Sequence, residues 1–196
     1  MPRVSEAHRE RRRRQILDAA RRCFIRKGFH QTSMADVLAE AGMSAGAVYR
    51  YYRGKNEIIT AITGEVFDQV HAVLGSITAQ DPPAPLPEAI RAGLRQVESF
   101  AFGPDGMAQL APHVWAEATH DPALATFVRD RYLDVRVLLA ELARAEQRAG
   151  RLRPDGDPDE IAAVLLGSVL GYLLQRLLIG DVTPDSYSAG LAAITT

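Results

Sequence analysis

Apolar residues recur at spacings of three and four along most of the chain, which indicates α-helices throughout. The first such stripe predicts a helix from about His8 to Lys27 that Gly28 ends. Its apolar members are Ile16, Ala20, Cys23 and Phe24. Cys23 is the only cysteine, and on this face we interpret it as a small core residue rather than a reactive thiol.

Two shorter helices follow. Ser33 and Asp36 have the spacing of a capping box, which predicts a second helix beginning after Ser33. Gly42 supplies a turn, and a third, very short helix is predicted from Ala45 to about Tyr52, with Ser44 as its cap. Two helices joined at a glycine turn have the spacing of a helix-turn-helix.

Prolines and helix-start signals divide the rest of the chain. A long apolar edge predicts a helix from Lys55 to about Ile77, and the proline-rich residues 79–87 form a stiff connector. Further helices are predicted at about 87–101, 105–119, 121–149 and 158–179, with a last one from Thr183-Pro184 to the C-terminus. We therefore expect an all-α fold with an N-terminal three-helix domain, residues 1–55, and a C-terminal helical domain, residues 56–196.

Charge is distributed unevenly between these two parts. Residues 1–55 contain 13 Lys and Arg against 5 Asp and Glu, and the remainder contains 10 against 19. A basic head on an acidic body is typical of nucleic-acid binding, although arginine-rich helices also simply solvate their outer face. The hydrophobic share of 47% is too high for a disordered protein.

The third predicted helix suits the major groove of DNA. It opens with almost no side-chain bulk, and Arg50 is the best candidate for reading a base edge, most naturally guanine. Val48 and Tyr52 are expected to pack inward. The predicted DNA-binding residues are Thr32, Ser33, Ser44, Ala45, Gly46, Tyr49, Arg50, Tyr51 and Lys55. The alternative is that the tyrosines are core residues and the arginine a solvated surface group.

The segment from Arg14 to about Ala61 resembles the N-terminal domain of the TetR family of bacterial transcriptional regulators. The matching residues are Ile16-Leu17-Asp18-Ala19-Ala20, Phe24, Gly28-Phe29, Thr32-Ser33, Ala41-Gly42-Met43-Ser44, Gly46, Val48-Tyr49, Tyr51-Tyr52, Lys55 and Ile58. Val48 and Tyr52 stand where Leu and Phe are more usual. The resemblance implies a C-terminal domain that dimerises and binds a small effector.

The expected dimer face consists of the most apolar predicted helix, over residues 161–179, together with the final helix. Gly167 and Gly171, four residues apart, would let another helix approach closely. The predicted dimer-interface residues are Val164, Gly167, Ser168, Gly171, Leu174, Tyr187 and Leu191. The alternative is that this helix is the central core helix of a monomer.

An effector pocket is predicted from an apolar and aromatic set with a few polar groups. Its members are Phe100, Met107, Leu110, His113, Trp115, Glu117, Phe127 and Tyr132. Such aromatic residues at helical spacing also occur simply as core. His113, Glu117 and His120 share one helix face and are a metal candidate, but polar surface is the preferred interpretation, so no metal and no cofactor is predicted.

We expect a cytoplasmic, ligand-responsive repressor that binds a palindromic operator as a homodimer and responds to a small, largely hydrophobic effector. An architectural DNA-binding protein without a ligand is the alternative, and an enzyme with a DNA-positioning head is a weaker one. No catalytic residue set is predicted. The apolar stretch from Ile161 to Leu174 is short and interrupted, so we do not expect it to span a bilayer.

Overall fold

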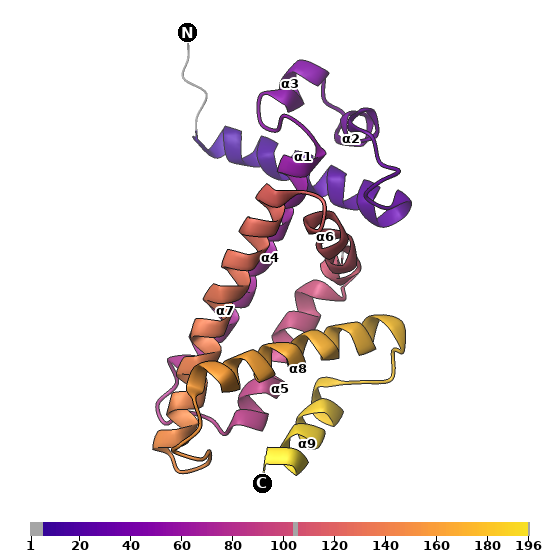
Figure 1. Ribbon diagram of the computed structural model, residues 1–196. Helices are drawn as coiled ribbons and strands as arrows, with labels where there is room; N and C mark the ends of the chain where they lie inside the picture. The colour runs from indigo at the N-terminus through magenta and orange to yellow at the C-terminus, as the bar shows by residue number, and fades with distance from the viewer. Residues whose placement is uncertain (1–5, 104–105, 196) are drawn as a thin grey trace. The chain divides into compact units, whose positions relative to one another are not determined.

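A computed structural model describes residues 6–103 and 106–195 of the chain. Within these ranges the protein is helical and contains no strand, as the apolar spacing predicts. Its helices are α1 (Glu6–Lys27), α2 (Met34–Ala41), α3 (Ala45–Tyr49), α4 (Lys55–Thr78), α5 (Leu86–Ala101), α6 (Ala111–Ala118), α7 (Pro122–Arg148), α8 (Pro158–Leu178) and α9 (Pro184–Thr195), with a 3-10 turn, η1 (Met107–Leu110), before α6 (Figure 1).

Two elements are shorter than predicted. The third helix ends at Tyr49, because the amides of Tyr51 and Tyr52 both donate to the carbonyl of Val48 and tighten the chain into a turn. The helix predicted over 105–119 is divided into η1 and α6, since Pro112 lies in the first turn of α6, where its missing amide proton is tolerated. Residue 105, where that helix was expected to begin, lies outside the described residues.

The chain forms two compact units. One comprises Met1–Val66 and Gln109–Phe127, and the other comprises Phe67–Ala108 and Val128–Thr196. α4 and α7 each contribute residues to both. The boundaries of these units differ from the predicted domain boundary at residue 55. That boundary separates a DNA-binding from an effector-binding part, and it stays a prediction.

The first unit has a core built on the apolar face of α1, and α1 packs on α2. The rings of Phe24 and Phe29 meet edge to face with centroids 5.2 Å apart. Cys23 is fully buried and burial raises the pKa of its thiol, which agrees with its interpretation as a core residue. Other large buried side chains here include Ile16, Val37, Val48, Ile58, Ile59, Ile62 and Leu124.

The second unit has an aliphatic core from α4, α5, α7, α8 and α9, and α9 lies alongside α5 (Figure 1). The fully buried Tyr172 of α8 packs edge to face on Tyr187 of α9, with ring centroids 5.2 Å apart. These contacts orient one side of α8 towards the core.

The other side of α8 is apolar and exposed. By length and composition α8 meets the requirements of a membrane-crossing helix, with a mean hydropathy of 1.8 over a window that is 17% buried. This differs from the expectation for the interrupted stretch 161–174, because the criterion applies to the whole helix, Pro158–Leu178, whose length is the predicted one. A helix in the core of a water-soluble protein also meets these two requirements, so they do not show what covers α8. Its cover has to be inferred from the exposed residues of the helix.

Candidate nucleic-acid interface

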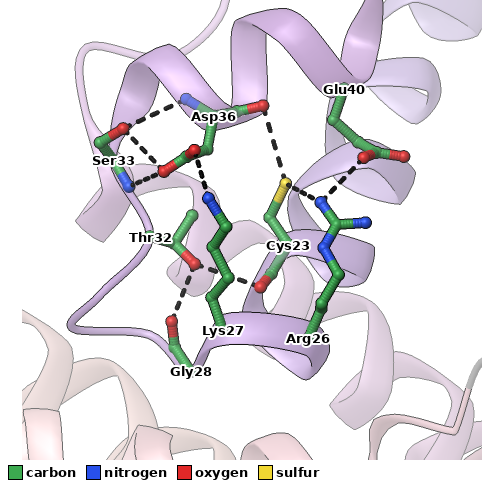
Figure 2. Close-up of polar contacts among 8 residues, drawn as sticks. All are labelled: Cys23, Arg26, Lys27, Gly28, Thr32, Ser33, Asp36 and Glu40. Atoms are coloured by element: carbon green, nitrogen blue, oxygen red, sulfur yellow. Dashed lines mark hydrogen bonds and ion pairs between the residues drawn. The ribbon is translucent and has the colours of Figure 1, made fainter.

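The start and end of α2 are determined by local hydrogen bonds. Ser33 Oγ accepts from the amide of Asp36 at 3.2 Å, and Asp36 Oδ2 accepts from the amide of Ser33 at 2.9 Å (Figure 2). This reciprocal capping box is the predicted one. Gly42 ends the helix at a φ of 62°, in the left-handed region that favours glycine. α3 therefore follows α2 after a tight turn.

Acidic groups of α2 pair with the cations at the end of α1 (Figure 2). Lys27 Nζ lies 2.6 Å from Asp36 Oδ1, and hydrogen bonds from Lys27 and Ser33 hold the pKa of Asp36 well below its usual range. Glu40 accepts from Arg22 at 2.7 Å and from Arg26 at 3.1 Å, which lowers the pKa of that carboxyl. These contacts join α1 to α2.

The pairing changes the interpretation of the basic charge in α1. Arg22, Arg26 and Lys27 keep side-chain exposures between 42% and 57% although they are paired. Arg21 is largely buried instead, with a side-chain exposure of 15%, and it pairs with Asp18 and Glu65. The cations in this half of α1 therefore stabilise the head, and they are not free counterions for DNA.

Thr32 differs from its predicted role. Its exposed fraction is 1%, and its hydroxyl lies 2.8 Å from the carbonyl of Gly28 and 3.2 Å from that of Cys23 (Figure 2). Carbonyls at the end of a helix lack intrahelical donors, so this hydroxyl satisfies the terminus of α1. The Thr32 side chain is buried and cannot reach a phosphate, whereas Ser33 is exposed.

The beginning of α3 is exposed and small, as the sequence predicts. Ser44, Ala45 and Gly46 are all exposed, and a Cβ added at Gly46 would meet no atom within 4 Å. Ser44 occupies the N-cap position, but its side chain makes no capping hydrogen bond, in contrast to the expectation. Its hydroxyl is thus available to a ligand, together with the amides of the first turn.

The end of α3 separates inward from outward side chains. Val48 and Tyr52 are buried, with exposed fractions of 0% and 3%, as predicted. Tyr49 is 47% exposed and Arg50 is exposed, while Tyr51 is half-buried. Among the described residues none forms a hydrogen bond or ion pair with the Arg50 side chain. Its guanidinium is therefore uncommitted at the end of a short helix.

Lys55 has protein partners that the sequence did not indicate. Its ammonium donates to the carbonyl of Phe29 at 3.0 Å and approaches that of His30 at 3.4 Å, and it lies 4.8 Å from the centroid of the Phe29 ring. Lys55 thus connects the α1–α2 loop to the start of α4. An ammonium has three donors, so one remains for a phosphate.

The arginine run of α1 contains both committed and free cations. Arg12 donates to Gln15 at 2.9 Å, and the Arg13 guanidinium lies 5.8 Å from the centroid of the Tyr52 ring. Arg11 and Arg14 are exposed, and across the part of the chain that the structure describes neither side chain has a hydrogen-bond or ion-pair partner. The members of this run, Arg11 to Arg14, are alike in sequence, and only their neighbours in the structure distinguish them.

The predicted dimer face is partly exposed and partly internal. Val164 and Leu174 are 69% and 39% exposed, and a Cβ added at Gly167 or Gly171 would meet nothing within 4 Å. Two predicted members do not fit, and they need correction. Leu191 is 8% exposed within the core of the second unit, and the Tyr187 hydroxyl donates to the carbonyl of Ser168 at 2.5 Å.

The exposed apolar face also has members that are not among the predicted interface residues. Leu178, Ile179 and Ile194 are 79%, 65% and 82% exposed. Their signal was available, because Leu178 continues the spacing of Val164, Gly167, Gly171 and Leu174 along one side of α8. We call these five residues of α8 the α8 face.

The residues predicted to bind an effector are divided between the two units. Phe100, Met107 and Tyr132 belong to the second unit, and Leu110, His113, Trp115, Glu117 and Phe127 belong to the first. Leu110 is buried, and Glu117 Oε2 lies 3.9 Å from His30 Nε2. The set as a whole stays a prediction.

The second unit contains a cavity of about 50 Å³ that none of the predicted effector residues lines. Aliphatic side chains of α4, α5, α7 and α8 surround it, among them Val73, Ile77, Leu94, Leu139 and Val169. In the sequence, the apolar edge of the predicted helix from Lys55 to about Ile77 indicates part of this lining. The predicted effector set does not include it, because that set was chosen for its aromatic residues.

The candidate metal face does not assemble into a site. His120 Nδ1 lies 2.8 Å from the hydroxyl of Thr119 and 3.1 Å from the carbonyl of Ala116. Among the described residues, no three His, Cys, Asp or Glu side chains lie close enough together to hold a metal ion.

Comparisons with known proteins cover both parts of the chain. Residues 16–62 match the model of bacterial regulatory proteins of the tetR family, and residues 107–194 match that of the C-terminal domain of the BetI-type transcriptional repressor. The HTH-type transcriptional repressor Rv1474c of Mycobacterium tuberculosis is 30% identical over 184 residues, which cover 92% of this chain and 90% of that protein.

Solved structures share the fold. Salmonella enterica GusR has a TM-score of 0.77 at 23% identity, over 98% of this chain and 96% of its own. A protein from Saccharomonospora viridis in complex with choline has a TM-score of 0.73 at 25% identity, over 94% of this chain and 95% of its own.

Proposed function

This chain belongs to the TetR family of bacterial regulatory proteins, and we propose that it is a repressor that binds a palindromic operator as a homodimer and releases it when a small effector binds. One observation carries the proposal. The start of α3 is exposed and nearly free of side-chain bulk, and an unpaired arginine lies at its other end. A helix of this form can approach base edges in the major groove.

The contacts to DNA follow from the polar groups around α3. Ser33, Ser44 and the amides at Ala45 and Gly46 would bind phosphates, and Arg50 would read a guanine. Tyr49, Tyr51 and the third donor of Lys55 would add further phosphate contacts. Arg11 and Arg14, which carry unpaired positive charge, would add salt-sensitive affinity.

Dimerisation would use the α8 face. Its two glycines and its exposed Val164, Leu174 and Leu178 form an apolar strip that water solvates poorly, and a second copy of the chain would cover it. Two recognition helices would then lie about 34 Å apart, on successive turns of one face of DNA. Such a protein would act in the cytoplasm.

An effector would act by binding one of two conformations more tightly than the other. The cavity of the second unit is the candidate effector site, and α4 supplies residues to that cavity as well as to the first unit. A shift of α4 would therefore alter the spacing of the two heads. The Saccharomonospora viridis protein is in complex with choline, whereas the all-aliphatic lining of the cavity in this chain favours a small, largely hydrophobic effector.

The experiment that tests the proposal is selection of bound fragments from random duplex DNA by the full-length protein, followed by the stoichiometry on the enriched sequence. We expect an inverted repeat bound by an even number of chains, with an affinity that falls steeply as salt rises. Enrichment of no motif, together with weak binding to every duplex, would exclude a sequence-specific repressor and favour an architectural DNA-binding protein.

A further inference from the structure

We propose that the cavity of the second unit accepts a neutral aliphatic group of the effector and rejects a quaternary ammonium group. This inference rests on the proposed function, because it assigns a ligand class to the effector site of that repressor. It concerns the cavity itself and the polar cluster one helical turn beyond it, both within the second unit.

The lining of the cavity offers no polar contact. Every residue that lines it is Val, Leu, Ile, Ala or Gly, and these residues come from four helices. Leu94 and Leu139 are 2% and 1% exposed, so this part of the wall is shielded from water. A charged or hydrogen-bonding group placed here would lose its hydration without gaining a partner. An alkyl group would lose nothing and would gain dispersion contacts with the walls.

The carboxylate that a cationic ligand would need is already occupied. Glu98 lies four residues, about one helical turn, beyond the cavity residue Leu94 on α5. Its Oε1 accepts a hydrogen bond from the Tyr172 hydroxyl at 2.5 Å and another from Arg176 Nε at 3.0 Å. The negative charge beside the cavity is thus balanced by a cation of the protein itself.

The neighbouring aromatic ring is occupied by the same cation. Quaternary ammonium groups are bound in proteins by aromatic faces. Here the Arg176 guanidinium lies 5.5 Å from the centroid of the Phe102 ring, and the rings of Tyr172 and Tyr187 pack on each other. Arg176 therefore takes both the carboxylate and the ring face, and it would repel a second positive charge.

The size of the cavity limits what it can hold. Its volume of about 50 Å³ suits a short or branched alkyl group, whereas sites for whole drug-sized ligands measure roughly 300–1,000 Å³. Gly93 controls this space. A Cβ added there would lie 3.3 Å from Ile77 Cδ1 and 4.0 Å from Val73 Cγ1, so an alanine would occupy room that a ligand needs.

Calorimetric titration of the full-length protein tests the inference, with 1-butanol, 1-hexanol and choline chloride as probes. We expect the alkanols to bind with a negative heat-capacity change and with affinity rising up to roughly fourfold per added methylene until the cavity is full. Choline is expected to give no binding heat at the same concentrations. Choline binding tighter than 1-hexanol binding would overturn the proposal.

Two alanine variants in helix interiors provide the matched comparison. Gly93→Ala should weaken 1-hexanol binding by about tenfold, whereas Gly75→Ala, whose Cβ meets nothing within 4 Å, should leave it unchanged. Equal effects of the two substitutions would place the alkanol elsewhere. Val97→Ala widens the cavity without filling it and should shift the preference to longer alkanols, so the proposal remains testable if Gly93→Ala fails to fold.

Operator binding, measured without any ligand on the sequence obtained by selection, separates this inference from the proposed function. A protein that binds its operator but no alkanol would overturn the ligand class alone. A protein that binds alkanols but no duplex in a sequence-dependent way would overturn the repressor and leave the chemistry of the cavity intact.

Discussion

The exposed surface around α3 and the exposed α8 face differ in what they leave without a partner. Around α3 the exposed groups are small or polar, from Ser44 to the uncommitted guanidinium of Arg50. On α8 they are aliphatic, with Val164 and Leu178 more than two-thirds exposed. The first surface is well solvated until a polyanion replaces its water, whereas the second is poorly solvated until another protein covers it.

The same contrast occurs within the head itself. The cations at the end of α1 pair with acids of α2 and α4, whereas Arg11 and Arg14 near its start pair with no acid within residues 6–103 and 106–195. Thirteen basic residues in the first 55 therefore do not mean thirteen contacts with DNA. Net charge indicates a class of partner, and the pairing of each cation decides which of them can reach it.

The largest effect is expected from a charge on the α8 face. Val164→Glu should dissociate the dimer and weaken operator binding by more than about tenfold, because each head alone makes half of the contacts. Analytical ultracentrifugation and fluorescence anisotropy measure the two quantities. Val137→Glu is the matched control, since Val137 is 57% exposed on α7. Dissociation by the control but not by Val164→Glu would move the interface to α7.

A smaller effect is expected at α3. Arg50→Ala should reduce discrimination at one base pair by roughly 1–3 kcal/mol, whereas Lys55→Ala should weaken all sequences alike. Competition binding with single-base variants of the operator measures the difference. Arg53→Ala is the control, since its side chain is 92% exposed and lies near Glu57. A uniform loss across all sequences in Arg50→Ala would remove Arg50 from the reading role.

Thr32 should affect stability and not DNA affinity. Thr32→Val removes the hydroxyl that satisfies the end of α1, and we expect the free energy of unfolding to fall by about 1–2 kcal/mol. Urea denaturation measures this change, and operator affinity at 25 °C should be unaltered. Thr60→Val, which removes a more exposed hydroxyl bonded to Asn56, should cost less. A variant of normal stability and weakened operator binding would restore Thr32 to the DNA interface.

The smallest effect is expected from acid. The pKa of Asp36 is lowered in the folded state, so its contribution to stability is present above the unfolded value of about 3.9 and is lost as the pH falls below it. The drop in the urea midpoint between pH 7 and pH 3 should therefore be larger for the wild type than for Asp36→Asn. The same comparison in Lys27→Gln checks the cause. An unchanged pH response in both variants would contradict it.

Much of the head could be predicted because its determinants are local. Gly28 and Gly42 adopt φ values of 79° and 62°, and Ser33 and Asp36 cap one another across three residues. Such features depend on backbone conformation and on hydrogen bonds within one turn, so a short stretch of sequence carries them. The inward and outward positions of Val48 and Arg50 follow from helical spacing in the same way.

The sequence by itself thus determined the all-helical fold, the helix-turn-helix and the family. Only the tertiary structure decided that Thr32 is internal and that Lys55 is bonded to carbonyls 25 and 26 residues away. It likewise decided that Leu191 belongs to the core and that Tyr187 packs against it. It also decided that Glu98 meets a tyrosine 74 residues away and that the cavity is aliphatic. These features depend on which distant segments pack together, and helical spacing alone specifies only which face is apolar, not what covers it.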